Sequence, residues 1–168
     1  MFSRAMLLAS IRSEVKIIRH LATKVPPGKL EWRPTPVQRS VKELLRYLSI
    51  CALVPALYVR DGTWDAAASL KPRETDLDPK DFDAAMERQE RELLAIVGSF
   101  SDAQMMERPT AMPWGTTCMT GQGFVDMCLK CLVAYRMQLF LYAKGAGNHD
   151  IGPSNCWIGV DAPKKPAG

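Results

Sequence analysis

The stretch from Thr120 to Gly147 constrains the fold more than any other part of this 168-residue chain. At roughly 100° per residue, its few charged side chains, Asp126, Lys130 and Lys144, fall on one narrow arc of a helix. Apolar side chains cover most of the remaining circumference. A helix with so small a polar arc must be buried on several sides, so other elements have to pack around it.

Three further segments show the apolar repeat of an amphipathic helix. Together with the long one, the predicted helices cover about residues 3–23, 40–60, 79–100 and 120–147. Ser40 and Glu43 form a capping box at the start of the second helix. No alternation typical of strands competes with this pattern. The sequence therefore predicts an all-α protein, a four-helix bundle over residues 1–147.

The remaining segments have no helical period. Residues 63–78 are predicted to be a polar connector, and residues 109–119 to be irregular. Residues 148–168 are predicted to form an extended C-terminal tail without regular structure, packed on the bundle or on a partner. Trp157 is expected to be buried in that contact, because an indole ring removes a large apolar area from water.

Three residues have predicted environments that a structure can check. Pro55 should kink the second helix and leave the carbonyl of Cys51 without its i+4 donor. His20 lies roughly opposite the apolar stripe of the first helix and should face solvent. Glu14 lies at the edge of that stripe, and we expect a partly exposed boundary residue there in preference to a pocket carboxylate.

Composition and charge argue against several function classes. The net charge is only +4, and no basic block is present, so nucleic-acid binding is not expected. No run of about 18 apolar residues is free of charges, so no membrane span is expected, and the first ten residues lack the features of a signal peptide. The five cysteines fit no disulfide framework, which points to a reducing, cytoplasmic setting.

Two short motifs carry a resemblance to a known family. The first is Arg33-Pro34 with Arg39-Ser40 and the run Glu43-Leu44-Leu45-Arg46-Tyr47-Leu48, and the second is Tyr135-Arg136-Met137-Gln138-Leu139 followed by Tyr142, Gly145 and Gly147. They resemble the start of helix two and the H-R-x-Q-L helix of the DinB superfamily, the YfiT-like metal-dependent bundles. The order and spacing of the motifs agree over essentially the whole chain.

The resemblance implies a divalent metal held by three histidines, one on the second helix and two on the fourth. Those positions correspond here to Tyr47, Cys131 and Tyr135, and none is a histidine. The chain has only two histidines, His20 and His149, and neither matches a ligand position. Two phenols and a thiol are a poor zinc set. The metal site is therefore predicted to be degenerate, with no metal and no cofactor.

The same region is predicted to form a ligand pocket. The candidate residues are Tyr47, Cys51, Cys131, Tyr135 and Gln138. Their polar groups can bind a small molecule, or can satisfy one another inside a sealed core. Cys128 and Cys131 have C-x-x-C spacing but lie well inside a helix, where core packing is expected rather than redox chemistry. A thiolate metal site formed by Cys51, Cys128 and Cys131 stays open.

Two classes of function remain. The first is a small-molecule binding or interaction protein of unknown ligand, built on a DinB-like bundle without the family's metal. The second is a DinB-like hydrolase or thiol-dependent transferase, as the resemblance implies, in which Tyr47, Cys131 and Tyr135 would carry acid–base or nucleophilic roles. Whether the protein is an enzyme is left open.

A homodimer is also predicted. The fourth helix has apolar side chains close to its polar arc, where a monomer should be solvated: Val133, Met137, Phe140 and Leu141. Large apolar side chains grouped on an outer face suggest a contact surface. We therefore expect the fourth helix to form the dimer interface.

Overall fold

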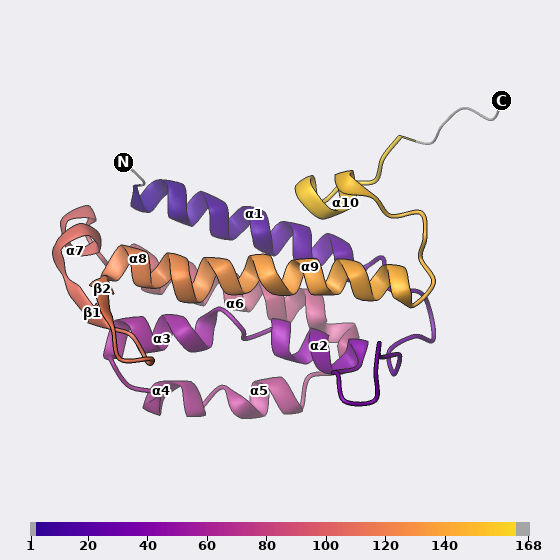
Figure 1. Ribbon diagram of the computed structural model, residues 1–168, viewed down its shortest axis with the longest axis horizontal. Coiled ribbons are helices and arrows are strands. Elements are labelled where there is room, and N and C mark those ends of the chain that lie inside the picture. The colour runs from indigo at the N-terminus through magenta and orange to yellow at the C-terminus, as the bar shows by residue number, and fades with distance from the viewer. Residues whose placement is uncertain (1–2, 164–168) are drawn as a thin grey trace.

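The computed structural model describes residues 3–163, and helices dominate it (Figure 1). The long helical segments are α1 (Arg4–Ala22), α2 (Val41–Leu48), α3 (Leu53–Asp61), α6 (Phe82–Gly98), and the continuous run α8 (Thr120–Phe124), η2 (Val125–Leu129) and α9 (Lys130–Gly145). The short elements are α4 (Asp65–Ala68), α5 (Lys71–Thr75), η1 (Pro79–Asp81), α7 (Asp102–Glu107), β1 (Pro109–Ala111), β2 (Thr117–Met119) and α10 (Pro153–Ile158). The prediction of an all-α protein is confirmed.

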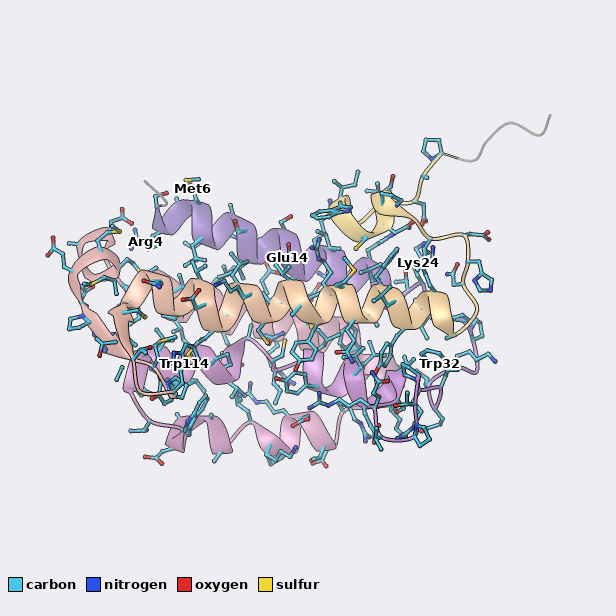
Figure 2. All side chains as sticks on the ribbon, viewed as in Figure 1. Arg4, Met6, Glu14, Lys24, Trp32 and Trp114 are labelled. Atoms are coloured by element: carbon cyan, nitrogen blue, oxygen red, sulfur yellow. The ribbon has the colours of Figure 1, made fainter. Side chains whose placement is uncertain are left out.

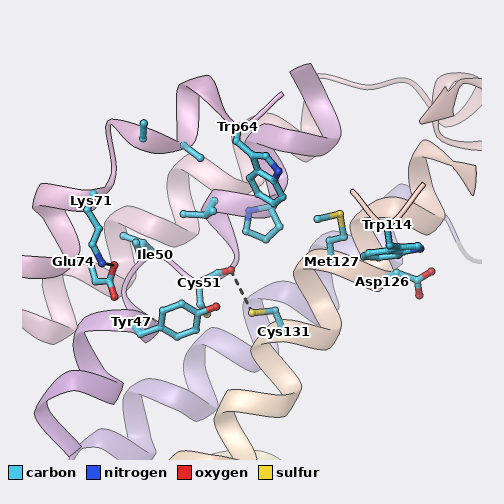
Figure 3. A pocket seen from close by; sticks show the side chains of 14 residues that line it. Tyr47, Ile50, Cys51, Trp64, Lys71, Glu74, Trp114, Asp126, Met127 and Cys131 are labelled. Atoms are coloured by element: carbon cyan, nitrogen blue, oxygen red, sulfur yellow. Dashed lines mark hydrogen bonds and ion pairs between the residues drawn. The ribbon is translucent and has the colours of Figure 1, made fainter. Parts of the chain in front are cut away.

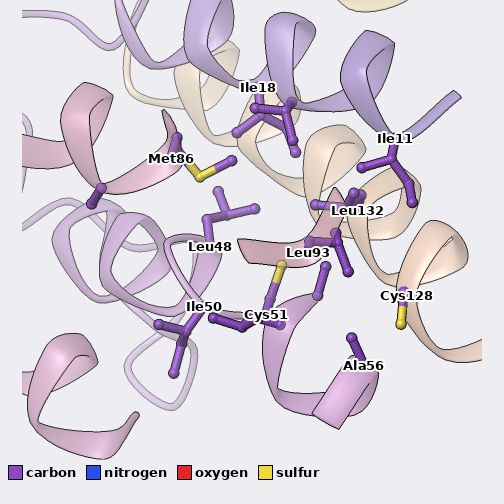
Figure 4. Close-up of a cluster of buried hydrophobic side chains, with 14 of the residues drawn as sticks. Ile11, Ile18, Leu48, Ile50, Cys51, Ala56, Met86, Leu93, Cys128 and Leu132 are labelled. Atoms are coloured by element: carbon purple, nitrogen blue, oxygen red, sulfur yellow. The ribbon is translucent and has the colours of Figure 1, made fainter. Parts of the chain in front are cut away.

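The core lies between these five long segments. α1 packs against α6 and α9, while α2 contacts α9 and α3 contacts both α6 and η2. Figure 4 shows part of the resulting apolar cluster, in which side chains from all five segments meet. Fully buried members include Ile11, Ile18, Leu48, Met86, Leu93 and Leu132. Among the described residues, no helix has both the length and the apolarity needed to cross a membrane.

Local sequence sets several of the helix ends. Ser3 caps α1, since its Oγ accepts a hydrogen bond from the backbone N–H of Met6. The capping box of Ser40 and Glu43 forms as predicted at the start of α2. Gly62 ends α3 in a left-handed conformation with φ of 76°, which glycine adopts without steric cost.

The second predicted helix is two helices, which corrects the expectation of one helix kinked at Pro55. α2 ends at Leu48, and α3 begins at Leu53, ahead of the proline. Since the proline nitrogen carries no hydrogen, it cannot donate to the carbonyl of Cys51. That carbonyl is bonded by a side chain from another helix, described below.

Gln89 of α6 holds the break between α2 and α3. Its Nε2 donates to the carbonyl of Leu48 at 2.8 Å. Its Oε1 accepts from the backbone N–H of Ala52 at 3.0 Å and from that of Leu53 at 3.4 Å. The residue is 1% exposed. The side-chain amide of Gln89 thus forms hydrogen bonds with backbone groups on both sides of the break. In a continuous helix these groups would bond to other backbone groups of the same helix.

Regular structure also forms in connectors predicted to have none. The polar connector contains α4 and α5, and the segment 109–119 forms the antiparallel hairpin β1–β2, with Thr110 opposite Cys118. Thr110 is buried, and its hydroxyl lies 2.8 Å from that of Thr120. These elements are too short to show a period in the sequence, so the periodicity argument could not detect them.

The predicted C-terminal tail needs correction as well. Residues 153–158 form the helix α10, which starts at Pro153 and packs on α1. Proline is well suited to the first turn of a helix, where no backbone donor is needed. Trp157 is 64% exposed rather than buried, and Asn155 and Cys156 are the buried residues of this helix. Residues 164–168 of the predicted tail lie outside the described residues.

The expectation that His20 faces solvent is wrong, and both His20 and the boundary residue Glu14 belong to polar networks that reach α10. His20 is largely buried instead of facing solvent, and its Nε2 lies 3.0 Å from Nδ2 of Asn155. Glu14 is mostly buried and forms an ion pair of 3.0 Å with Arg136, whose Nη1 donates to the carbonyl of Cys156 at 2.7 Å. Burial raises the pKa of Glu14, and Arg136 opposes that shift. Sequence periodicity cannot show these environments, because α10 covers this end of α1.

Trp32 and Trp114 lie toward opposite ends of the molecule (Figure 2). Trp32 is partly buried and packs against the core. Its ring meets that of Tyr142 nearly edge to face, with centroids 5.5 Å apart. Trp114 is 61% exposed and lies in the turn between β1 and β2. This second indole belongs to the pocket described next.

Candidate ligand-binding pocket

A pocket of about 520 Å³ lies between α2–α3, the short helix α4, and the η2–α9 run (Figure 3). A volume of this size is typical of sites for small organic molecules. Its lining is mostly apolar and aromatic. The lining residues are Tyr47, Ile50, Cys51, Val54, Pro55, Trp64, Ala67, Ala68, Lys71, Glu74, Trp114, Asp126, Met127 and Cys131.

The break between α2 and α3 supplies one wall of the pocket. The thiol of Cys131, on α9, donates to the carbonyl of Cys51 at 3.3 Å (Figure 3). This is the carbonyl that Pro55 leaves without a backbone donor. The predicted unsatisfied carbonyl therefore lies in the pocket wall and is bonded by a side chain of a different helix.

The two tyrosines of the predicted site pack together. The rings of Tyr47 and Tyr135 meet at a centroid distance of 4.7 Å and an interplanar angle of 62°. Tyr47 lines the pocket, and Tyr135 supports it from behind. The guanidinium of Arg39 lies 4.3 Å from the centroid of the Tyr47 ring, at the distance of a cation–π contact.

The hydroxyl and thiol groups of this wall differ in the direction in which their pKa values are shifted. Burial raises the pKa of the Tyr47 hydroxyl, and its neighbours Cys131 and Tyr135 raise it further. A hydrogen bond with Cys131 and complete burial raise the pKa of the Cys51 thiol. The pKa of Cys131 is lowered by hydrogen bonds from the Cys51 thiol and the Tyr47 hydroxyl, although burial opposes this. Cys131 is therefore the thiol of this pair that ionises first.

Four of the five predicted site residues come together in the structure, and one does not. Tyr47, Cys51 and Cys131 line the pocket, with Tyr135 directly behind. Gln138 lies farther along α9, where its Nε2 donates to the hydroxyl of Tyr142 at 3.0 Å. It belongs to the packing around Tyr142 rather than to this pocket.

The donor set at the three positions aligned with the family's histidines does not fit a metal ion. A neutral phenol is a poor ligand, and burial makes Tyr47 still harder to ionise. Cys128 is fully buried, and burial raises the pKa of its thiol. Within residues 3–163, no three His, Cys, Asp or Glu side chains gather closely enough to hold a metal. Cys51, Cys128 and Cys131 therefore do not form a three-thiol site.

Sequence reasoning missed the two tryptophans of the pocket. Trp64 precedes α4 and packs on Tyr58, with ring centroids 4.4 Å apart, while Trp114 reaches the pocket from the hairpin turn. Both are large apolar side chains inside connectors rich in polar residues and proline. A large apolar side chain in a polar connector indicates that the residue packs against something. It does not indicate which surface the indole contacts.

The η2 segment was predicted as ordinary helix and is a π-helical turn from Val125 to Leu129. Such turns insert one extra residue into a helix and are frequent at functional sites. Asp126 and Met127 of this turn line the pocket. Asp126 also pairs with Lys130, one turn further along. The π turn thus sets which side chains of the long helix face the pocket.

Comparisons with known proteins support the fold. No family model matches the sequence, and a comparison with curated proteins finds no match either. The structure is similar to the crystal structure of a DinB-like protein, YjoA, from Bacillus subtilis, with 16% sequence identity and a TM-score of 0.66. The match covers 84% of this chain and 92% of that chain. The resemblance noted in the sequence is confirmed at the level of the fold, which is an all-α DinB-like fold.

Proposed function

We propose that this protein binds a small organic molecule in the pocket between α2–α3 and η2–α9. The observation that carries the proposal is a cavity of about 520 Å³ with mainly apolar walls and a few polar groups on one side. Tyr47 and Cys131 can fix the orientation of a ligand through hydrogen bonds, because both line the cavity and burial keeps the Tyr47 hydroxyl protonated. Apolar walls with few polar groups are the usual composition of ligand sites.

A pair of neighbouring alanines on α4 allows a sharp test. Ala67 lines the pocket, whereas Ala66 of the same short helix does not and faces a different groove, toward α3 and α6. Ala67→Phe should fill part of the cavity and abolish binding of compounds found by ligand-observed NMR in a fragment library. Ala66→Phe is the matched control and should leave binding intact. A library without a single hit that depends on Ala67 in this way would contradict the proposal.

The proposal includes a degenerate metal site. It is supported by the donor chemistry of Tyr47, Cys131 and Tyr135, which does not suit zinc. Elemental analysis of protein purified without an affinity tag should find less than one zinc or nickel ion per chain. Replacing all three residues by histidine should create zinc or nickel binding, measurable by calorimetry. Stoichiometric metal in the native protein would overturn this part of the proposal.

One observation favours a second function, a thiol-dependent transferase or hydrolase. Cys131 lines the pocket, and its neighbours lower the pKa of its thiol, which are two properties of a reactive cysteine. In that case iodoacetamide should modify Cys131 faster than Cys118, which is half-buried and has a raised pKa. Slower modification of Cys131 than of Cys118 would remove the support for this alternative.

The proposed assembly is a homodimer in a cytoplasmic setting. Leu141 and Val133 are exposed on the outer face of α9, while Met137 and Phe140 are partly covered. An apolar outer face of this kind favours association. The five cysteines are free, as expected for a reducing compartment. Light scattering at tens of micromolar, an order of magnitude suited to ordinary dimers, should give the mass of two chains.

A further inference from the structure

We propose that the ligand of this pocket is an organic cation: an ammonium group, or another single positive charge, carried on an aromatic or aliphatic body. This inference rests on the proposed function, which supplies the pocket, and adds the charge of the ligand. It is drawn from the aromatic walls, the balance of charge and the size of the cavity.

The aromatic walls are the first observation. Trp64 and Trp114 approach the pocket from different elements, and the side chain of Met127 lies between them in Figure 3. The two indoles are 45% and 61% exposed, so a large part of each ring lacks a protein partner. Indole is the strongest aromatic acceptor of a cation, because its face carries negative charge density.

The position of Trp64 is fixed by its own packing. Its ring lies at a tilt of 35° to that of Tyr58, which is buried in α3. One face of the indole is therefore used inside the protein, while the side toward the cavity remains available. Tyr47 shows that the aromatic groups here do accept cations, since Arg39 already lies 4.3 Å from the centroid of its ring.

The charge lining the cavity is the second observation. Among the described residues, the lining includes two carboxylates, Glu74 and Asp126, and one ammonium group, Lys71. Lys71 is engaged by Glu74 at 2.7 Å. Asp126 pairs with Lys130, which is exposed and does not line the pocket. Each carboxylate is thus paired, but Asp126 presents its negative charge to the cavity while its partner Lys130 stays outside the lining, which disfavours an anionic ligand at that end.

Asp126 and the indole of Trp114 both line the pocket and overlap in the view of Figure 3. A carboxylate beside an aromatic face offers a cation both a charge partner and a π surface. The ammonium of Lys130 approaches Asp126 from the solvent side, with 67% of its side chain exposed. A bound cation can therefore share this carboxylate without having to displace a buried ion pair.

The volume sets the size of the ligand. A cavity of about 520 Å³ accommodates a two-ring molecule with a substituted ammonium group. At the Tyr47 and Cys131 end, burial raises the pKa of the Tyr47 hydroxyl, which therefore offers a hydrogen bond without a negative charge. That end suits the uncharged part of the ligand, and the Trp114 and Asp126 end suits its cation.

Three probes that share a 1-naphthylmethyl body and differ in the charge of the head group test the sign of the ligand's charge. They are (1-naphthylmethyl)trimethylammonium, 1-naphthylmethanol and 1-naphthylacetate, titrated by calorimetry into the full-length protein. The cation should bind at least about tenfold more tightly than the alcohol, which corresponds to about 1.4 kcal/mol, and the acetate should bind most weakly. Equal or tighter binding of the alcohol or the acetate would overturn the cation inference while leaving the proposed pocket intact. No binding by any of the three would count against the pocket itself.

Matched tryptophan and aspartate variants test which residues recognise the charge of the ligand. Trp114→Leu should weaken binding of the cationic probe at least about fivefold, within the usual strength of a cation–π contact, and change binding of the alcohol much less. Trp157→Leu is the control, because Trp157 is similarly exposed but lies on α10, away from the pocket. Asp126→Asn should likewise weaken only the cation, whereas Asp102→Asn, at an exposed site on α7, should not. Equal losses for cation and alcohol in both pocket variants would refute the inference.

Discussion

Gln89 provides the most direct test of how this fold positions its pocket. We consider the variant Gln89→Met. Methionine has a side chain of similar length, but it lacks the amide that bonds to the backbone between α2 and α3. Two of the three backbone bonds of Gln89 are 3.0 Å or shorter, those to Leu48 and Ala52. Leaving a buried backbone group without a partner costs about 1–3 kcal/mol. The loss of two such bonds should therefore reduce the free energy of unfolding by about 2–6 kcal/mol.

That loss is large against an ordinary stability of about 5–15 kcal/mol. For a chain of this size, 1 kcal/mol corresponds to about 2–4 °C in melting temperature, so the loss should be about 4 °C at the least. Urea unfolding followed by circular dichroism measures the free energy. Arg88→Met is the control, because Arg88 is the exposed neighbour of Gln89 on the same helix, and it should cost less than about 0.5 kcal/mol.

The same variant should also disturb the pocket. Because the break presents the Cys51 carbonyl to Cys131, loosening it should weaken ligand binding even where the protein stays folded. If Gln89→Met unfolds at the same urea concentration as the native protein, water can satisfy the break, and the proposed role of Gln89 is refuted.

Gly145→Ala should reduce the free energy of unfolding by about 1–3 kcal/mol, because a Cβ there would lie 2.7 Å from Cη2 of Trp32; an unchanged melting temperature would show that Trp32 moves aside freely. Burial lowers the pKa of His20 below its ordinary value of 6.5, so the folded state binds fewer protons than the unfolded state near that pH. The contribution of His20 to stability is then complete above pH 6.5 and falls as the pH drops through that value. His20→Gln should flatten this part of the curve of unfolding free energy against pH, and an equally steep curve in the variant would contradict the assignment. Leu141→Glu should shift the mass seen by light scattering to that of one chain, and a persistent dimer would exclude α9 as the interface.

Much of the fold follows from local sequence. The period of the apolar residues predicts α1 to within a residue at each end, and the capping box at Ser40 forms as expected. The missing N–H of Pro55 predicts a carbonyl at Cys51 in need of a donor, and Cys131 supplies it. The period, the cap and the missing donor depend on groups one or two helical turns apart, which a sequence displays directly. The choice of Cys131 as the donor does not, because it lies 80 residues from Cys51.

The pocket depends on contacts that the sequence does not display. The break between α2 and α3 is held by Gln89 from another helix, and Trp114 reaches the cavity from the turn of a short hairpin that contacts α8. His20 lies at a polar position of its own helix and is covered by α10. Periodicity shows which face of a helix is apolar, but it does not show which distant segment will cover a given residue. Only the tertiary structure decided those contacts, because each joins groups that are far apart along the chain.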